Sequence, residues 1–453
     1  MTQNNCSPSE LDISITIADE NRPRLVIVGG GFAGLHLAQH LKTADLQIVL
    51  LDRNNFHTFQ PLLYQVATAM LEPDSVANSF RKIFQNQKNF HFRMVEVERI
   101  DPENKVVRTS AGCLKYDFLV VATGARTNFY GMRDLAGHAL SMKEISQGIA
   151  IRQRLFRNFE NALLTNDTAE RESLMNIIIV GGGPTGIEIA GAIGELKKFI
   201  LPTDYPELDL SMMRIHLIEA SDRLSASMSS KASLLARQAL EKFSVTMWFN
   251  TKIITYDGKT ARTSDGRELD SKLLIWVAGV TGNIPVGLDR DEIIFRGRIK
   301  VDSYNRVTEY DDIYAIGDVA AVITQETPDG HPMLAPVAIQ QAINLAANLA
   351  ALAQKGDSQL TPFTYKSHGV MATVGRNRAI VERAGFSFGG FPAWLTWLFV
   401  HLLTLVGFRN KIIAVVNWAW NYISYDRSIR LIIPFICETR KTLTGQKTDD
   451  IRK

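Results

Sequence analysis

Two stretches of the chain share one pattern of apolar and glycine positions. In each, a run of apolar β-forming residues leads into a glycine cluster, and apolar residues at helical spacing follow. The first stretch covers 25–41 and the second 175–196. Each is followed by another apolar run, at 47–51 and at 215–218. The repeated order of strand, turn, helix and strand predicts an α/β fold built from two related units.

Both glycine clusters have the spacing G-x-G-x-x-G, which is typical of a dinucleotide-binding turn. The first glycine permits the tight turn, the second lets the backbone approach a pyrophosphate, and the third lets the helix pack close to the strand. The acids that end the next strands, Asp52 and Glu219, can accept hydrogen bonds from an adenosine ribose. Glu219 would repel a 2′-phosphate, which favours NADH over NADPH. The residues assigned to these sites are Gly29, Gly31, Phe32, Ala33, Gly34, Asp52 and Arg53 in the first unit, and Gly181, Gly183, Thr185, Gly186 and Glu219 in the second.

Three further buried runs end in small residues that let backbone come close to a bound cofactor. The run 116–121 leads into Ala122, Thr123 and Gly124, and the run 272–277 leads into Ala278 and Gly279. The third, 312–316, ends at Gly317 and is followed by Asp318. Glycine-rich turns in an ordinary α/β sheet are the alternative interpretation, and the duplication of the whole motif order argues against it.

Composition and charge narrow the function classes. The net charge of +3 excludes a strongly basic protein that binds nucleic acid through its overall positive charge. Residues 409–453 hold nine Lys/Arg against four Asp/Glu, which indicates a local anionic partner such as a membrane surface. Cys6, Cys113 and Cys437 lie far apart, so they predict free thiols in a reducing compartment rather than a disulfide framework or a metal site. The acidic N-terminal stretch fits no secretory or transit signal, so residence in the cytoplasm is expected.

The C-terminal region contains an uncharged run between Arg383 and Arg409. A helix that spans a membrane needs about 20 predominantly apolar residues, and two glycines and a proline interrupt this run at its start. The next block, 412–423, is rich in Trp and Tyr and is flanked by basic residues, which favours a helix lying in the headgroup region on anionic lipid. A buried core or dimer helix and a true transmembrane helix are the alternatives.

In their order and in their residues, these motifs resemble those of the two-dinucleotide-binding flavoprotein reductases. Within that group, the segments 55–67, 335–342 and 369–376 and the Trp-rich tail resemble the type II NADH dehydrogenases, the non-pumping NADH:quinone oxidoreductases. The resemblance implies two Rossmann-like domains: a discontinuous FAD-binding domain at 24–140 and 295–365, and an inserted NADH-binding domain at 141–294. It also implies a C-terminal α+β and helical region at 366–453, with membrane-associating helices at 391–434.

The activity implied by the resemblance is hydride transfer from NADH to FAD, followed by two-electron reduction of a quinone without proton pumping. The implied setting is a peripheral homodimer on an anionic lipid bilayer, at the cytoplasmic face of the inner membrane. Asp318 would bind the ribityl chain or pyrophosphate of FAD, and Gln60 and Val97 are further expected FAD contacts. No metal and no nucleic acid are expected.

Glu188 is expected in the first turn of the second unit's helix, where it would orient the nicotinamide and relay a proton. Burial would raise its pKa and the helix N-terminus would lower it. The alternative role is an acid that only stabilises the helix dipole. Members of the family often have Ala-Gln where this chain has Ala335 and Pro336, so the quinone contact is assigned to Gln340 or Gln341. These two could also be polar positions on an Ala-rich helix.

Two competing functions follow from the same motifs. A sulfide:quinone oxidoreductase or a disulfide reductase would need paired cysteines at the flavin, which the three cysteines do not supply. A redox-sensing flavoprotein would bind NADH and signal through a partner that docks on the basic tail.

Overall fold

The computed structural model describes residues 15, 17–325, 327–354, 360–424 and 430–432, and the statements below concern these residues. Cys6, Cys437 and most of the basic tail lie outside them. Cys113 lies within them and is buried.

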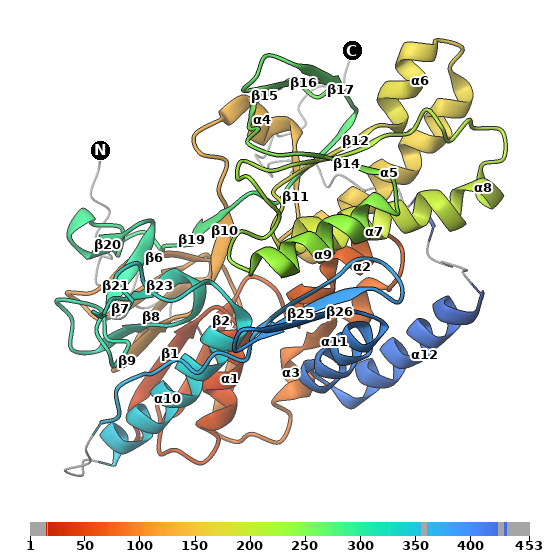
Figure 1. Ribbon diagram of the computed structural model, residues 1–453. Helices are drawn as coiled ribbons and strands as arrows, with labels where there is room; N and C mark the ends of the chain where they lie inside the picture. Colours follow the sequence, from red (N-terminus) through yellow and green to blue (C-terminus); the bar gives the residue numbers. More distant parts are fainter. Residues whose placement is uncertain (1–14, 16, 326, 355–359, 425–429, 433–453) are drawn as a thin grey trace, which may run out of the picture.

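The first unit is a five-stranded parallel sheet (Figure 1). Four of its strands pair in parallel, and β22 adds the edge, although it comes almost 200 residues later in the chain. Helices α1 (Phe32–His40) and α10 (Ala335–Ala353) pack together, and their apolar residues share a core with one face of the sheet. The strands, in sheet order, are β5 (Phe90–Met94), β2 (Gln47–Asp52), β1 (Arg24–Val28), β9 (Phe118–Val121) and β22 (Ile313–Ala315).

The other core of this unit includes two small sheets and buries apolar side chains from the opposite face of β1, β2, β9 and β22. One small sheet is β6 (Val97–Asp101), β7 (Val106–Thr109) and β8 (Gly112–Lys115), and the other is β20 (Ile294–Phe295), β21 (Arg298–Val301) and β23 (Ala320–Val322).

The second unit repeats the parallel sheet with the same spatial order. The edge strand β11 (Leu140–Ser141) takes the place that β22 has in the first sheet, although it precedes the glycine loop in the chain. It straddles the domain boundary expected after residue 140. The other strands are β18 (Leu273–Trp276), β12 (Ile177–Val180), β13 (Ile215–Ile218) and β14 (Val245–Trp248), and the helices are α4 (Arg133–His138), α5 (Ile145–Leu164), α6 (Thr168–Met175), α7 (Pro184–Phe199), α8 (Leu201–Asp204) and α9 (Ser230–Glu241).

Short elements connect and cover these two sheets. The antiparallel pair β10 (Ala125–Thr127) and β19 (Val280–Gly282) lies where the chain passes between the units. The remaining elements are β3 (Phe56–Thr58), α2 (Leu63–Ala67), β4 (Ala77–Ser79) and α3 (Phe80–Ile83) in the first unit, and the sheet β15 (Ile253–Tyr256), β16 (Thr260–Thr263) and β17 (Glu268–Asp270) in the second.

The C-terminal region is an antiparallel sheet followed by two helices, which lie side by side in Figure 1. At 14 residues, α11 is shorter than the roughly 20 residues that a spanning helix needs. Among the described helices, α10 is the one that is long and apolar enough to span a membrane, and it packs on α1. The elements are β24 (Val370–Thr373), β25 (Ala379–Arg383), β26 (Phe386–Gly390), α11 (Phe391–Thr404) and α12 (Phe408–Ser424).

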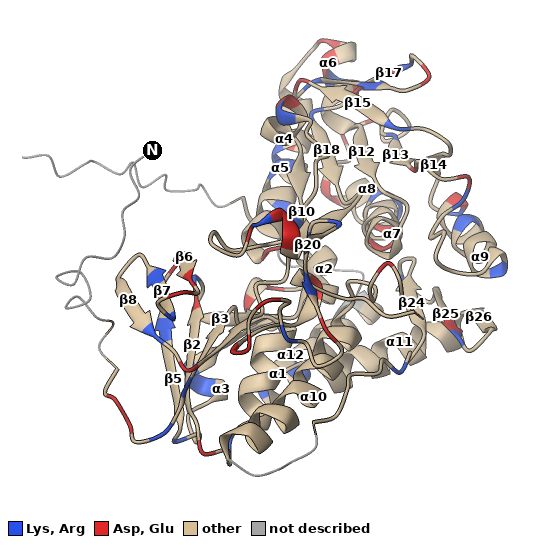
Figure 2. Cartoon of the chain, turned by 90° about the vertical axis from the view of Figure 1, so that its left-hand side faces the viewer, with Lys and Arg blue, Asp and Glu red and all other residues tan. Residues whose placement is uncertain are grey.

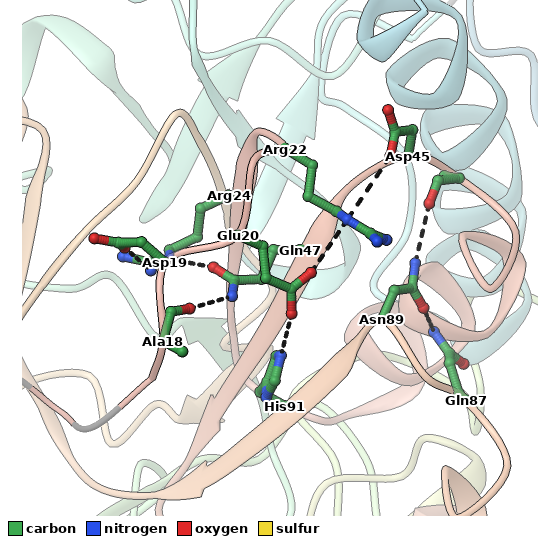
Figure 3. Close-up of polar contacts among 11 residues, drawn as sticks. Ala18, Asp19, Glu20, Arg22, Arg24, Asp45, Gln47, Gln87, Asn89 and His91 are labelled. Atoms are coloured by element: carbon green, nitrogen blue, oxygen red, sulfur yellow. Dashed lines mark hydrogen bonds and ion pairs between the residues drawn. The ribbon is translucent and has the colours of Figure 1, made fainter.

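Two sets of polar contacts hold the end segments against the first unit. Before β1, the Gln47 amide donates to the Ala18 carbonyl at 2.7 Å and accepts from Arg24, and Glu20 pairs with His91 (Figure 3). At the other end, the Asn410 amide of α12 donates to the carbonyls of three residues at 2.8–3.2 Å. These residues are Asp74, Ser75 and Ala77.

Candidate active site

In each of the two glycine loops, one glycine is needed for close packing inside the protein and another borders open space. A Cβ at Gly34 would overlap the carbonyl oxygen of Gly29, and one at Gly186 would overlap that of Gly181. By contrast, a Cβ at Gly31 or Gly183 would meet no atom within 4 Å. Open space above a bare loop backbone at a helix N-terminus is what the pyrophosphate of a dinucleotide requires, so both loops fit such a cofactor.

The acids at the ends of β2 and β13 hold these loops in the same way. Asp52 accepts hydrogen bonds from the N–H of Gly30 at 2.6 Å and of Asn54 at 2.7 Å. Glu219 accepts from Gly182 at 2.6 Å and from Ser221 at 2.8 Å. Burial raises the pKa of Asp52, and these backbone N–H groups lower it in part. The sequence pattern predicted the ribose role of the acids but not that each one also fixes its own glycine loop.

The strand ends with small residues lie directly against the glycine loops. A Cβ at Gly29 would meet the Ala122 carbonyl, and one at Gly181 would meet the Ala278 backbone at 2.8 Å. Gly279 adopts φ +127° and lies against Tyr130. Gly124 adopts φ +67° with open space beside it.

The loops of the two units also contact each other. The Thr123 hydroxyl donates to the Asn283 carbonyl at 2.6 Å. In the segment that enters the second unit, Lys143 lies 3.8 Å from Asp318, and its neighbour Glu144 pairs with Arg53. Lys143 and Glu144 were missed by the sequence reasoning, because no motif marks them.

Asp318 lies in a largely buried turn between β22 and β23. Burial raises the pKa of its carboxyl, and the cations Lys143 and Arg298 oppose that rise. The N–H of the preceding Gly317 donates to the Gln341 amide oxygen at 2.7 Å, and Gly317 packs against Ala33. The Asp318 carboxyl is therefore held at the carboxyl edge of the first sheet, next to the first glycine loop.

The structure places the remaining predicted residues as follows. Gln341 is buried and serves the Gly317 turn, whereas Gln340 exchanges two hydrogen bonds with the Lys366 backbone. Both amides therefore contact backbone, which agrees with the alternative of structural polar positions, and their contact with quinone stays a prediction. Gln60 and Thr185 are exposed, while Phe32 packs edge-on against His57 and Phe59. Val97 begins β6 and packs against the core of the first unit that includes the two small sheets.

Glu188 is buried beside the C-terminal region. It is the fifth residue of α7, and the first turn of that helix contains no acid, so the expected first-turn position is wrong. One carboxyl oxygen lies 3.5 Å from the N–H of Thr373 at the end of β24. Burial raises the pKa of Glu188 to about 8, although the Thr373 N–H and the Trp397 indole lower it in part. Desolvation outweighs the helix dipole, whose influence fades beyond the first turn.

Elements distant in sequence meet near this carboxyl, and α12 joins them through Gln65. The Tyr64 hydroxyl of α2 lies 3.3 Å from the Thr373 hydroxyl and accepts from the Gln65 amide at 2.9 Å. The Gln65 amide oxygen in turn accepts from the Trp418 indole of α12 at 2.9 Å. Trp397 of α11 is fully buried and stacks on His401. The motif at 55–67 flagged Tyr64, but nothing in the sequence indicated that it would meet β24 and α11.

Comparison with known proteins agrees with this geometry. The pattern of the pyridine nucleotide-disulphide oxidoreductase family matches residues 23–342. The type II NADH:quinone oxidoreductase NdhA of Mycobacterium tuberculosis is 34% identical over 438 residues, with 93% of this chain and 92% of that protein covered. The mitochondrial internal alternative NAD(P)H-ubiquinone oxidoreductase A1 of Solanum tuberosum is 30% identical, covering 88% and 86%.

A solved structure shares the fold over most of the chain. NDH2 of Plasmodium falciparum in complex with NADH superposes with a TM-score of 0.82, covering 91% of this chain and all of that chain, at 18% sequence identity. The family pattern spans well over half of the chain, and NdhA is similar over nearly its full length. The chain therefore belongs to the pyridine nucleotide-disulphide oxidoreductase family and, within it, to the type II NADH:quinone oxidoreductases, which pass electrons from NADH to a quinone.

Proposed function

We propose that the first unit binds FAD, that the second binds NADH, and that quinone is reduced beside the C-terminal region. The observation that carries this proposal is the meeting of the two nucleotide sites. The Thr123–Asn283 and Lys143–Asp318 contacts join the loops that follow the strands of both sheets. Ligands of open parallel sheets lie outside these carboxyl ends, so two dinucleotides bound there would approach each other.

The protein's own groups supply binding, orientation and proton handling. Gly31 and Gly183 offer backbone N–H groups to the two pyrophosphates, and Asp52 and Glu219 accept from the riboses. Bound FAD would supply the redox chemistry by taking two electrons from NADH and yielding them to quinone. Glu188, with a pKa of about 8, is mostly protonated at neutral pH, which suits an acid that delivers a proton and takes another.

The outer faces of α11 and α12 support association with one leaflet of a membrane. α11 carries no charged residue and is drawn entirely tan in Figure 2. Large apolar side chains on both helices are exposed, including Phe399 at 62%, Phe408 at 79% and Trp420 at 59%. Arg409 and Lys411 start α12 beside them, which fits rings in the interface and cations on anionic headgroups. The homodimer, the cytoplasmic face and the absence of proton pumping stay predictions.

One experiment tests the redox proposal. Gently extracted protein should be yellow, should release FAD on boiling, and should oxidise NADH with formation of one quinol per NADH when a short-chain quinone is added. Colourless protein that holds no FAD would overturn the cofactor assignment. A yellow protein that binds NADH but forms only a stable reduced complex would instead favour the redox-sensing alternative.

A second experiment tests the membrane proposal. Replacing both Phe399 and Trp420 with Ser should release the protein from vesicles that contain anionic lipid, because two exposed apolar anchors are lost. The matched control replaces the exposed Leu164 and Leu234 of the second unit with Ser. Equal vesicle binding by both double variants would overturn the assignment of this face.

A further inference from the structure

A cavity of about 50 Å³ lies between α2, α7, α11 and α12. Aromatic and apolar side chains form most of its wall. A cavity of about 10–15 Å³ can hold one water if two to four polar groups are in reach, so this one has room for a short chain of waters. The polar groups that line it are the side chains of Tyr64, Gln65, Glu195, Thr373 and Arg376.

Glu195 lies at the outer end of the cavity. It follows Glu188 by seven residues on α7, which places both on one helix face about 10 Å apart along the axis. Its side chain is only 4% exposed, and the Arg376 guanidinium lies 3.7 Å away. Arg376 also donates to the Tyr422 carbonyl at 2.7 Å, and its own side chain is 14% exposed. The carboxylate is thus paired, and its end of the cavity is close to solvent.

The inner end of the cavity reaches the surroundings of Glu188. Tyr64 and Thr373 line the cavity with their side chains 3.3 Å apart, and the Thr373 N–H lies 3.5 Å from the Glu188 carboxyl. Trp397, which also lines the cavity, has a buried indole N–H with no well-formed hydrogen bond among the described residues. Burial raises the pKa of Tyr64, and negative charge on Glu188 raises it further.

The reaction needs a proton from water. NADH, one proton and quinone give NAD⁺ and quinol: the C–H bond of NADH breaks, its hydride carries two electrons and one proton, and two O–H bonds form. The second proton cannot come from lipid, which the exposed apolar faces of α11 and α12 are proposed to contact. A route from the aqueous side is therefore required.

We propose that this cavity is that route, in which Glu195 takes a proton from solvent and waters pass it along the Tyr64 and Thr373 hydroxyls to Glu188. The inference rests on the proposed role of Glu188 as a proton donor and deepens it. Glu195 is then a relay residue that acts through Glu188 and does not touch quinone. The titratable and charged groups facing the route are Tyr64 of α2, Glu188 and Glu195 of α7, Arg376 after β24, His401 behind Trp397 on α11, and Tyr422 of α12.

The test follows the proton on Glu188 in FAD-loaded enzyme without NADH. Infrared spectroscopy resolves the C=O stretch of a protonated buried carboxyl, and the Glu188→Gln variant assigns the band. After transfer to D₂O, Glu195→Gln should slow exchange of that proton by about tenfold or more. A positioned proton-transfer group typically speeds proton transfer by at least this factor. The control Glu241→Gln, which removes an exposed acid of α9, should exchange like the wild type.

Kinetics provide the second readout. In Glu195→Gln, quinol formation should slow at alkaline pH while the KM values for NADH and quinone are unchanged. Ala192→Leu, which fills the cavity without altering charge, should have the same effect if Glu195→Gln fails to fold. Unchanged exchange and kcat in both variants would overturn the route, as would a change confined to the quinone KM, because the cavity would then hold a quinone tail. A Glu188→Gln variant with normal quinol formation would instead refute the proposed role of Glu188 itself.

Discussion

The backbone N–H of Gly317 donates a 2.7 Å hydrogen bond to the side-chain oxygen of Gln341, and this bond fixes the turn that presents Asp318. Gln341 is 1% exposed, so Gln341→Ala would leave a buried N–H without its partner, at a cost of about 1–3 kcal/mol. We expect lower stability to urea and about tenfold weaker FAD binding, which a flavin fluorescence titration would measure. Gln340→Ala is the control, because the Gln340 amide bonds to the Lys366 backbone and not to the Gly317 turn among the described residues. Equal loss of FAD in both variants would contradict this role.

Substitutions at different glycines of the two loops should affect either folding or cofactor binding. Gly31→Ala places a methyl group in open space, so the protein should fold with near-normal stability but bind FAD more weakly. Gly34→Ala drives a methyl group into the Gly29 carbonyl and should cost about 3 kcal/mol or more. In the second unit, Gly183→Ala should raise the KM for NADH while FAD is retained, and Gly186→Ala should destabilise. Urea unfolding and FAD content check each pair, and a Gly31→Ala protein that unfolds like Gly34→Ala would refute the distinction.

Sequence reasoning succeeded where one short segment carries both the pattern and its physical cause. The strand, glycine turn and helix around Gly29 and Gly181 need only local conformation and the period of apolar residues. The surroundings of Glu188 could not be predicted, because Tyr64, Thr373 and Trp397 come from elements whose contacts depend on how the C-terminal sheet packs on α7. The same holds for β11, whose two residues join a sheet that otherwise begins 37 residues later.

Glu219 should set the preference for NADH over NADPH. Its carboxylate would repel a 2′-phosphate, so Glu219→Ala should raise the kcat/KM for NADPH relative to NADH by about tenfold. Because Glu219 also accepts from the N–H groups of Gly182 and Ser221, the variant should lose about 1–2 kcal/mol of stability. Steady-state kinetics with both nucleotides check the ratio. Asp222→Ala, which removes an exposed acid close by, should leave it unchanged.

Asn410 should determine whether α12 stays docked. Its single amide group contacts three backbone carbonyls of the segment 74–77. Asn410→Ala should therefore cost about 1–3 kcal/mol and speed proteolysis between α11 and α12. Asn417→Ala, which loses one contact with Glu72, should have a smaller effect. Equal proteolysis rates in the two variants would contradict a dominant role for Asn410.

The raised pKa of Glu188 predicts a defined dependence of stability on pH. The folded protein holds this proton up to about pH 8, whereas an unfolded Glu releases it near its ordinary pKa of 4.5. Between these values the folded state binds more protons, so the contribution of Glu188 to the free energy of unfolding falls as pH rises and levels off above about pH 8. Glu188→Gln cannot titrate, so its stability relative to the wild type should rise across this window by up to a few kcal/mol. Urea unfolding of both proteins at about five pH values between pH 5 and pH 9 would measure this difference in stability. The pH-dependent contributions of Asp52 and Asp318 to stability cancel in the difference, because both proteins contain these residues. Parallel curves would show that the folded protein does not hold this proton.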